Sequence, residues 1–247
     1  MKRLLCIAIA LIASVVAAED AATNQSIVIF GASGTIGQAL VSEALQRGHH
    51  VMGVSRSPDK FDYVEENFTA AAGNPTDANS VTALVAGADA IIIAVGGRTA
   101  TNPQETAMNQ TALAVTEALA ELGPKSPQVV VVAGGMTMLG SRQKMIENMP
   151  PNAPQGSAMY ALFLGHWEAY ETYLKSDINW TFVAPPMNIL GFRNGPDVRS
   201  GEYRASTTER LVTPDGKNEI SMSDLAVAVV DFAEGSDFNR VKVAVGY

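Results

Sequence analysis

The sequence predicts an α/β fold with a doubly wound parallel sheet. Short runs rich in β-branched residues alternate along the chain with stretches in which apolar residues recur at helical spacing. Several of these runs are apolar throughout, which is typical of strands covered by helices on both faces. No proline-, glycine- or serine-rich stretch divides the 247 residues, so we expect a single domain over residues 24–247.

The alternation also places the individual elements. Strands are expected at 27–30, 50–55, 68–72, 90–95, 128–133, 180–184 and 241–245. Helices are expected from the turn at Gly34 to Gly48, at 78–85, 104–122 and 158–175, and from about Ser221 to Ala233. Residues 148–156 hold three prolines and suit neither kind of element, so we expect a loop there.

Three glycines spaced three apart, Gly31, Gly34 and Gly37, join the first strand to the first helix. Gly31 permits a tight turn, Gly34 lets a diphosphate approach the backbone, and Gly37 lets the helix pack closely on the strand. The helix N-terminus also offers free N–H groups to an anion. The turn therefore predicts a Rossmann-like dinucleotide site that also uses Ser33, Thr35 and Ile36; an ordinary glycine-rich turn is the alternative.

These motifs point to a family. Gly31–Gly37, followed by Arg47–Val51 and Val54–Pro58, resembles the atypical short-chain dehydrogenase/reductases with an NAD(P)H-binding domain. The NADH-flavin reductase-like and biliverdin reductase B-like members are the most similar in pattern, and the NmrA-like proteins are more distant. The resemblance runs from about Ile27 to Tyr247. It implies an NAD(P)H-dependent reductase, or, as the alternative, a non-catalytic protein that binds or senses NADP.

The end of the second strand indicates which cofactor is bound. An acidic residue there would hold the ribose 2′-hydroxyl. Here Ser55, Arg56 and Ser57 occupy the position, and the nearest acid, Asp59, lies beyond a proline. Because a guanidinium neutralises a 2′-phosphate and donates several hydrogen bonds to it, Arg56 predicts NADP(H) over NAD(H). A solvated surface arginine is the alternative.

Two further strand ends should contact the cofactor. In an open parallel sheet, ligands bind outside the carboxyl ends of the strands. Val95, Gly96 and Gly97 follow the fourth strand, and we expect them beside the ribose or the phosphates. Relatives often carry an acid directly after the glycine that ends the third strand, where this chain has Asn74, so the resemblance implies an adenine contact for Asn74.

The acceptor side of the site is expected after the fifth and sixth strands. Met136 can line a pocket because methionine packs adaptably around flat ligands, and core packing is its alternative role. Pro185 ends a strand that resembles the family's Trp-Thr-x-x-x-Pro segment, which borders the nicotinamide. Regular periodicity is lost over 191–215, a segment that we expect to form a small C-terminal substrate cap. Four arginines of that cap could attract an anionic substrate such as a flavin phosphate, or could simply be solvated: Arg193, Arg199, Arg204 and Arg210.

The usual catalytic pair of short-chain dehydrogenases is missing. Those enzymes place Tyr and Lys four residues apart on a helix, so that the ammonium lowers the pKa of the phenol. Here Tyr160 is followed four residues later by Leu164. We therefore expect hydride transfer to a flavin, quinone or other conjugated acceptor that takes its proton from water. The catalytic residues stay unassigned, with Tyr160 and His166 as candidates and a structural histidine as the alternative for His166. The three histidines form no visible metal set.

Charge and the N-terminal residues bear on partners and location. The formal charge of −8 disfavours nucleic acid as a ligand. Lys2 and Arg3 precede an uncharged run, Leu4–Ala18, that ends in small residues. This pattern predicts a signal peptide over residues 1–18 and an exported protein, periplasmic or secreted, with no membrane span after cleavage; a retained anchor is the alternative. The single cysteine, Cys6, lies inside this segment.

Overall fold

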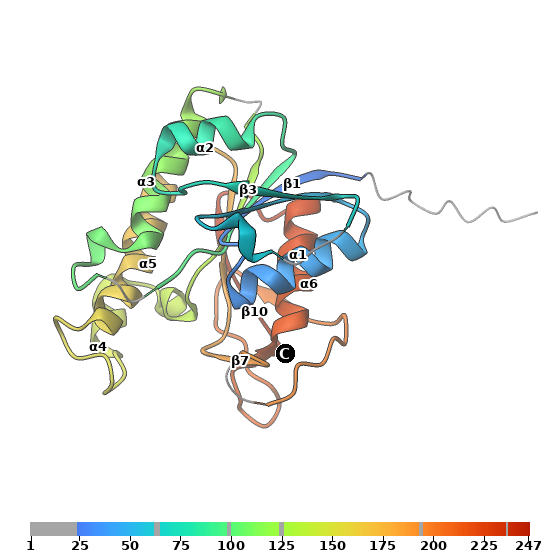
Figure 1. The fold of residues 1–247 in the computed structure, drawn as a ribbon. Helices are drawn as coiled ribbons and strands as arrows, with labels where there is room; N and C mark the ends of the chain where they lie inside the picture. Colours follow the sequence, from blue (N-terminus) through green and yellow to red (C-terminus); the bar gives the residue numbers. More distant parts are fainter. Residues whose placement is uncertain (1–23, 62–64, 98–99, 124–125, 193–194, 236) are drawn as a thin grey trace, which may run out of the picture.

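A sheet runs through the middle of the protein (Figure 1). It has eight strands, in the order β3-β2-β1-β4-β5-β6-β10-β8. It is seen in a computed structural model that describes residues 24–61, 65–97, 100–123, 126–192, 195–235 and 237–247. The strands are β1 Ser26–Phe30, β2 His50–Ser55, β3 Phe68–Ala72, β4 Ala90–Ile93, β5 Gln128–Val132, β6 Trp180–Ala184, β8 Arg204–Ser206 and β10 Val241–Gly246. All neighbours pair in parallel except β8, which is antiparallel to β10. The predicted doubly wound sheet is confirmed.

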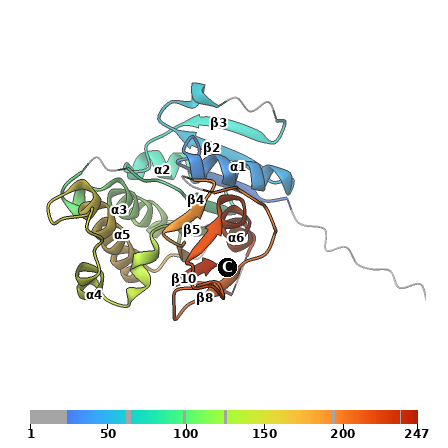
Figure 2. The same cartoon turned by 90° about the horizontal axis from the view of Figure 1, so that it is seen from below.

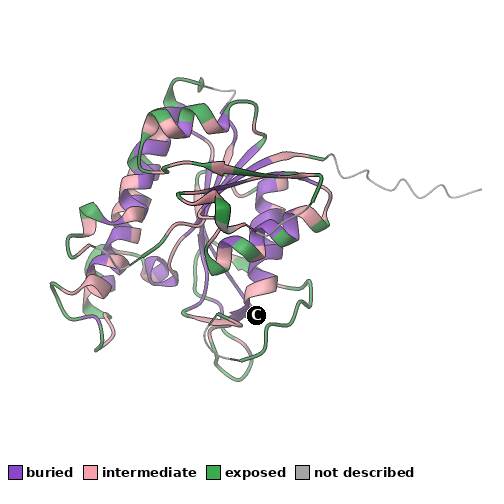
Figure 3. Cartoon of the chain, in the orientation of Figure 1, coloured by how far each residue is buried: buried purple, intermediate pink, exposed green. Residues whose placement is uncertain are grey.

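Helices cover both faces of this sheet (Figure 2). One face carries α1 Thr35–Gln46 and α6 Met222–Glu234; the other carries α2 Ala78–Val85, α3 Ala107–Ala120 and α5 Ala158–Lys175. Alternate residues of β1 belong to two separate cores, with Ile27 and Ile29 on the α1 face and Val28 and Phe30 on the α3 face. The central strands are buried on both faces (Figure 3), which explains why β4, β5 and β6 are almost entirely apolar.

One predicted helix is divided and one helix is unexpected, and in both cases a capping side chain sets the start of the helix. The predicted helix 104–122 is divided into a short 3₁₀ turn, Pro103–Glu105, and α3. The hydroxyl of Thr106 accepts a hydrogen bond from the backbone N–H of Asn109 and starts α3 anew. A short helix that the sequence pattern does not predict, α4 Arg142–Glu147, begins in the same way, because the hydroxyl of Ser141 accepts from the N–H of Lys144.

Smaller elements complete the chain. Further 3₁₀ turns are Pro58–Lys60 and Gly135–Leu139, and β7 Asn188–Leu190 pairs in parallel with β9 Glu219–Ser221. Among the described residues, no helix is both long enough and apolar enough to cross a membrane. The predicted signal peptide, residues 1–18, lies outside the described residues.

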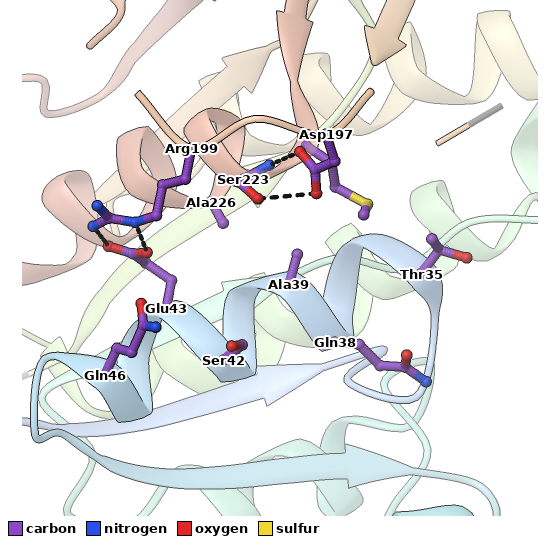
Figure 4. Close-up of a pocket in the computed structure, with 11 residues that line it drawn as sticks. Thr35, Gln38, Ala39, Ser42, Glu43, Gln46, Asp197, Arg199, Ser223 and Ala226 are labelled. Atoms are coloured by element: carbon purple, nitrogen blue, oxygen red, sulfur yellow. Dashed lines mark hydrogen bonds and ion pairs between the residues drawn. The ribbon is translucent and has the colours of Figure 1, made fainter. Parts of the chain in front are cut away.

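A clamp formed by residues 197–201 holds the segment after β7 against two helices. The carboxylate of Asp197 accepts from the N–H and the hydroxyl of Ser223 at the start of α6, both at 2.9 Å. Arg199 donates two hydrogen bonds, of 2.8 and 2.9 Å, to the carboxylate of Glu43 on α1 (Figure 4). A groove of about 300 Å³ lies between α1 and this segment. The clamp therefore ties together the two helices of one face.

A buried carboxylate on α6 accepts several hydrogen bonds from the clamp. Asp224 on α6 is fully buried. It accepts from the N–H groups of Ser200 and Gly201, from the hydroxyl of Ser200 at 2.6 Å, and from the phenol of Tyr247 at 2.6 Å. Burial by itself raises the pKa of Asp224, but the hydrogen bonds, led by that from Ser200, outweigh burial and lower it.

Candidate cofactor and acceptor site

The three glycines of the first turn have different surroundings. Gly31 has a positive φ of 81°, and a Cβ placed on it would lie 2.4 Å from the carbonyl oxygen of Ala94. A Cβ on Gly37 would lie 2.1 Å from the carbonyl oxygen of Gly31. A Cβ on Gly34 would meet only that same oxygen, at 3.2 Å. Gly31 and Gly37 are thus required by the protein's own packing, whereas Gly34 keeps space open outside it.

That open space lies at the N-terminus of α1. Gly34 is the N-cap residue and, because it has no side chain, it makes no side-chain capping hydrogen bond. Gly34 and Thr35 are both exposed. Uncapped N–H groups and the positive end of the helix dipole bind phosphate groups in many proteins. The residues present therefore fit the diphosphate of a dinucleotide.

At the end of β2, hydroxyl groups and a guanidinium lie together. The hydroxyl oxygens of Ser33 and Ser55 are 2.9 Å apart, and Ser55 also accepts from the N–H of Ser57. Arg56 is exposed, and within the described part of the chain it forms no ion pair. Its charge is therefore available to a ligand. Asn74, at the end of β3, uses its side-chain oxygen to accept from the N–H and hydroxyl of Thr76, which leaves its amide donors exposed.

A cavity of about 830 Å³ opens at the carboxyl ends of the central strands. It begins at the glycine turn and passes the turns that follow β4, β5 and β6. Of the residues predicted from the sequence, it is lined by Gly34, Thr35, Ile36, Val95, Gly96, Gly97, His166 and Pro185. Its other walls are formed by Ala94, Val132, Ala133, Pro150, Asn152, Met159, Leu162, Phe163, Met187, Asn188, Ile189 and Phe192.

Two predicted site residues lie elsewhere. Met136 is only 5% exposed and packs in a small core with Met145 and Trp167, because the turn after β5 directs it inward. Tyr160 packs against the same core and is not on the cavity wall. Core packing, the alternative role for Met136, is thus what the structure shows. Arg193 lies outside the described residues.

His166 is positioned by the glycine pair that follows β5. A Cβ on Gly134 would lie 2.5 Å from Nδ1 of His166, and a Cβ on Gly135 would lie 2.3 Å from the carbonyl oxygen of Pro185. The turn can therefore touch both α5 and the end of β6 only because it carries no side chains. Nδ1 of His166 is buried and has no hydrogen-bond partner among the described residues. Burial lowers the pKa of His166 from 6.5 to about 4, so the imidazole is neutral at pH 7.

The predicted cap makes little contact with the cavity. Within residues 191–215, as far as they are described, only Phe192 lines it. Arg199 is held by Glu43, Arg204 donates to the carbonyl oxygens of Val212 and Tyr247, and Arg210 donates to Asn218. Arg199 is thus neutralised by Glu43, whereas Arg204 and Arg210 are exposed and form no ion pair with an acidic side chain of the described residues. The attraction of an anionic substrate by the cap stays a prediction.

The sequence analysis missed most of the apolar wall. Met159, Leu162 and Phe163 on α5 follow the same helical pattern as core residues, so their position on a cavity has no separate signal. Met187 and Phe192 could have been found. Met187 comes soon after the end of β6, where open parallel sheets bind their ligands, and Phe192 follows a few residues later at the start of the segment expected to form the cap.

Comparison with known proteins identifies the family. The model of a family described as NAD(P)H-binding matches residues 31–235. The chain belongs to this NAD(P)H-binding family. The resemblance seen in the sequence motifs is thereby confirmed, and the glycine turn that begins the match is the turn described above.

Three relatives illustrate the range of similarity. The uncharacterized protein YwnB of Bacillus subtilis (strain 168) is 28% identical over 220 residues, which cover 88% of this chain and 96% of that protein. A solved structure from Burkholderia pseudomallei, provisionally named an exported protein, is 30% identical with a TM-score of 0.72 and covers 90% of this chain and all of its own. A structure from Streptococcus pneumoniae TIGR4, provisionally named an NADH-flavin reductase, is 20% identical with a TM-score of 0.69, covers 90% of this chain and 99% of its own, and supports the fold.

Proposed function

We propose that this protein is an NADPH-dependent reductase that passes hydride to a conjugated acceptor such as a quinone or a flavin. The observation that carries the proposal is the continuous cavity of about 830 Å³. It joins an anion-binding helix N-terminus to a mainly apolar compartment at the carboxyl edge of the sheet. The bound cofactor supplies hydride, and the chain supplies binding and orientation.

The chain's own residues have distinct roles in binding. The first turn of α1 holds the diphosphate where Gly34 leaves room for it. Arg56, next to the hydroxyls of Ser33 and Ser55, neutralises the 2′-phosphate of the adenosine ribose. Gly96 and Gly97 follow β4, and a Cβ on either would meet nothing within 4 Å. Their backbone therefore gives the cofactor room to cross the edge of the sheet toward Pro185.

No strong acid is needed for this reaction. Tyr160 is packed away from the cavity, and His166 is neutral at pH 7 because burial lowers its pKa to about 4. A quinone or flavin accepts hydride readily when it is held at the right distance, and water can supply its proton. The missing Tyr-Lys pair is therefore compatible with turnover.

A turnover assay tests the proposal. NADPH oxidation is followed with a panel of quinones and flavins, and NADPH affinity is measured separately by titration. We expect acceptor-dependent oxidation, which Gly34→Val abolishes together with NADPH binding. If the wild-type protein binds NADPH but reduces no acceptor in the panel, it is a nucleotide sensor of the NmrA-like kind and the reductase proposal is wrong.

We also propose that the protein is exported. The support is the pattern of Lys2 and Arg3 before the uncharged run Leu4–Ala18. The relative from Burkholderia pseudomallei that is provisionally named an exported protein points in the same direction. Cell fractionation with intact-mass measurement should find the protein outside the cytoplasm and shortened by residues 1–18. A cytoplasmic protein that retains Met1–Ala18 would contradict this.

A further inference from the structure

The acceptor compartment of the cavity is built mainly from apolar side chains. Met159, Leu162 and Phe163 contribute from α5, and Met187, Ile189 and Phe192 from the segment after β6. Met187 is 52% exposed and Phe192 is 38% exposed, although contact with water is unfavourable for both side chains. A ligand that covers them gains most if it is itself apolar, and a charged group placed here would lose its hydration without compensation.

One imidazole nitrogen supplies a polar point in this compartment. His166 lines the cavity, and its Nδ1 is buried without a partner among the described residues. Nε2 forms no hydrogen bond with a described residue, and unlike Nδ1 it is not buried. Nε2 is therefore open to solvent, and it is open through the cavity that the residue lines.

The position of Nδ1 selects the tautomer. A proton on Nδ1 would have no acceptor there, because the ring edge is packed against Gly134. A proton on Nε2 can be donated to water or to a ligand in the cavity. The neutral imidazole is therefore expected to carry its single proton on Nε2.

We infer that the acceptor is an uncharged, planar carbonyl compound, such as a naphthoquinone, that lies against Met187 and Phe192 and accepts a hydrogen bond at one oxygen from Nε2–H of His166. This inference rests on the proposed reductase function and specifies its acceptor. The balanced reaction is NADPH + H⁺ + quinone → NADP⁺ + hydroquinone. Two electrons and the hydrogen of a nicotinamide C–H bond pass to the quinone, and solvent supplies the second proton. His166 orients the oxygen and keeps its own proton.

Two pairs of acceptors that differ in charge test the apolar compartment. Kinetics with NADPH compare 2-methyl-1,4-naphthoquinone with 1,4-naphthoquinone-2-sulfonate, and riboflavin with its 5′-phosphate. We expect kcat/KM to be at least about tenfold lower for the sulfonate, through KM, and lower for the flavin phosphate than for riboflavin. Binding of both naphthoquinones to the protein loaded with NADP⁺, which cannot reduce them, should show the same order by calorimetry.

A charge placed on the compartment should shift the preference toward the sulfonate. Met187→Lys adds an ammonium at the cavity wall, and we expect it to favour the sulfonate over the neutral quinone by at least about tenfold relative to the wild-type ratio. Leu174→Lys is the matched control, because Leu174 is also 52% exposed but lies on α5 outside the cavity lining. The control should keep both the wild-type ratio and the wild-type NADPH affinity.

His166 is tested by substitution and by NMR. His166→Leu removes the donor and should raise KM for the neutral quinone about 3- to 10-fold, whereas His166→Gln keeps a donor and should recover most of the loss. With only three histidines in the chain, nitrogen-detected spectra can assign the tautomer. We expect the Nε2–H form, no titration between pH 5 and 8, and a shifted Nε2 signal when the quinone binds to the NADP⁺ complex.

The outcomes separate this inference from the proposed function. If no acceptor is reduced at all, the reductase proposal fails. If acceptors are reduced but the sulfonate or the flavin phosphate is preferred, or if Met187→Lys and Leu174→Lys behave alike, the uncharged acceptor is wrong and the reductase proposal stands. If His166 carries its proton on Nδ1, or if His166→Gln is no better than His166→Leu, the hydrogen bond from His166 is wrong.

Discussion

The two halves of the cavity are built in opposite ways. The cofactor half is centred on one continuous turn, Gly31–Gly37, in which the essential feature is the absence of side chains at the three glycines. The acceptor half comes from three separate stretches, at 150–152, 159–166 and 185–192, and consists of side chains that meet only in the folded protein. The first half is defined by backbone geometry and the second by packing.

This difference predicts how each half responds to change. A side chain added to the glycine turn must collide with the backbone or with the cofactor, so the effect should be nearly complete. A side chain changed in the acceptor half alters one part of a broad apolar surface, so the effect should be graded and should appear in acceptor affinity. Substitutions in the two halves can test this contrast.

The largest effects are expected within the glycine turn, where two neighbouring positions should fail for different reasons. Gly37→Val places a Cβ 2.1 Å from the carbonyl oxygen of Gly31 and should destabilise the fold by about 3 kcal/mol or more. Gly34→Val meets that oxygen only at 3.2 Å, so it should fold and yet lose NADPH binding. Thermal denaturation and NADPH titration of both variants measure this. A folded Gly34→Val that binds NADPH normally would show that the diphosphate lies elsewhere.

The contrast also explains how much could be predicted from the sequence. Five of the predicted elements have the bounds expected from local periodicity and caps: β2, β3, α2, α5 and β6. The glycine turn could be predicted as well, because a turn that needs positive φ or a close backbone approach requires glycine at fixed positions in the sequence. In contrast, nothing local distinguishes Leu162 on the cavity wall from a core leucine, or Met136 in the core from a pocket methionine.

A second large effect is expected where the clamp supports the acceptor half. Asp224→Asn removes the charge that accepts hydrogen bonds from Ser200, Gly201 and Tyr247, and should destabilise the fold by about 3 kcal/mol. A Cβ on Gly191 would lie 2.5 Å from Cβ of Asp197, so the clamp packs directly behind the wall that contains Phe192. The acceptor KM should therefore rise while NADPH affinity changes little.

The pH dependence of this variant has a definite sign. Because the folded protein lowers the pKa of Asp224, its ionised form stabilises the fold above the unfolded pKa of about 3.9, and that contribution is lost as the pH falls through the lower folded value. Urea denaturation of wild type and Asp224→Asn at pH 7 and at lower pH should show the difference shrinking toward acid. A difference that grows toward acid would contradict the assignment.

A smaller and more selective effect is expected at Arg56, which follows β2 and would bind the cofactor through its side chain. Arg56→Ala removes a charge-assisted interaction with the 2′-phosphate, so the free energy of NADPH binding should become roughly 1.5 to 3 kcal/mol less favourable. This corresponds to a loss of affinity of about tenfold or more. NADH binding should be nearly unchanged because NADH lacks that phosphate. Titration with NADPH and with NADH measures the affinity of wild type and Arg56→Ala for each cofactor. Equal losses, or a wild-type preference for NADH, would show that Arg56 does not select the cofactor.

The smallest effects are expected from the two candidate proton donors. A positioned general acid contributes about 10² to 10⁴ in rate. Tyr160 packs against the core of Met136 and Met145, so Tyr160→Phe should leave turnover within about twofold. His166→Ala should lower kcat/KM by about tenfold or less, since it removes a hydrogen bond but no transferred proton.

The pH profile decides whether His166 only orients the acceptor. Because burial lowers the pKa of His166 to about 4, an orienting role requires turnover that is flat between pH 5 and 8. The same lowered pKa favours the neutral form in the folded state. The unfolded chain therefore binds more protons between pH 4 and 6.5, and His166 makes stability rise with pH over that window. His166→Ala should flatten this part of the stability curve. If turnover instead falls more than a hundredfold in His166→Ala while NADPH still binds, His166 is a proton donor, and the acceptor half holds a catalytic group as well as a binding surface.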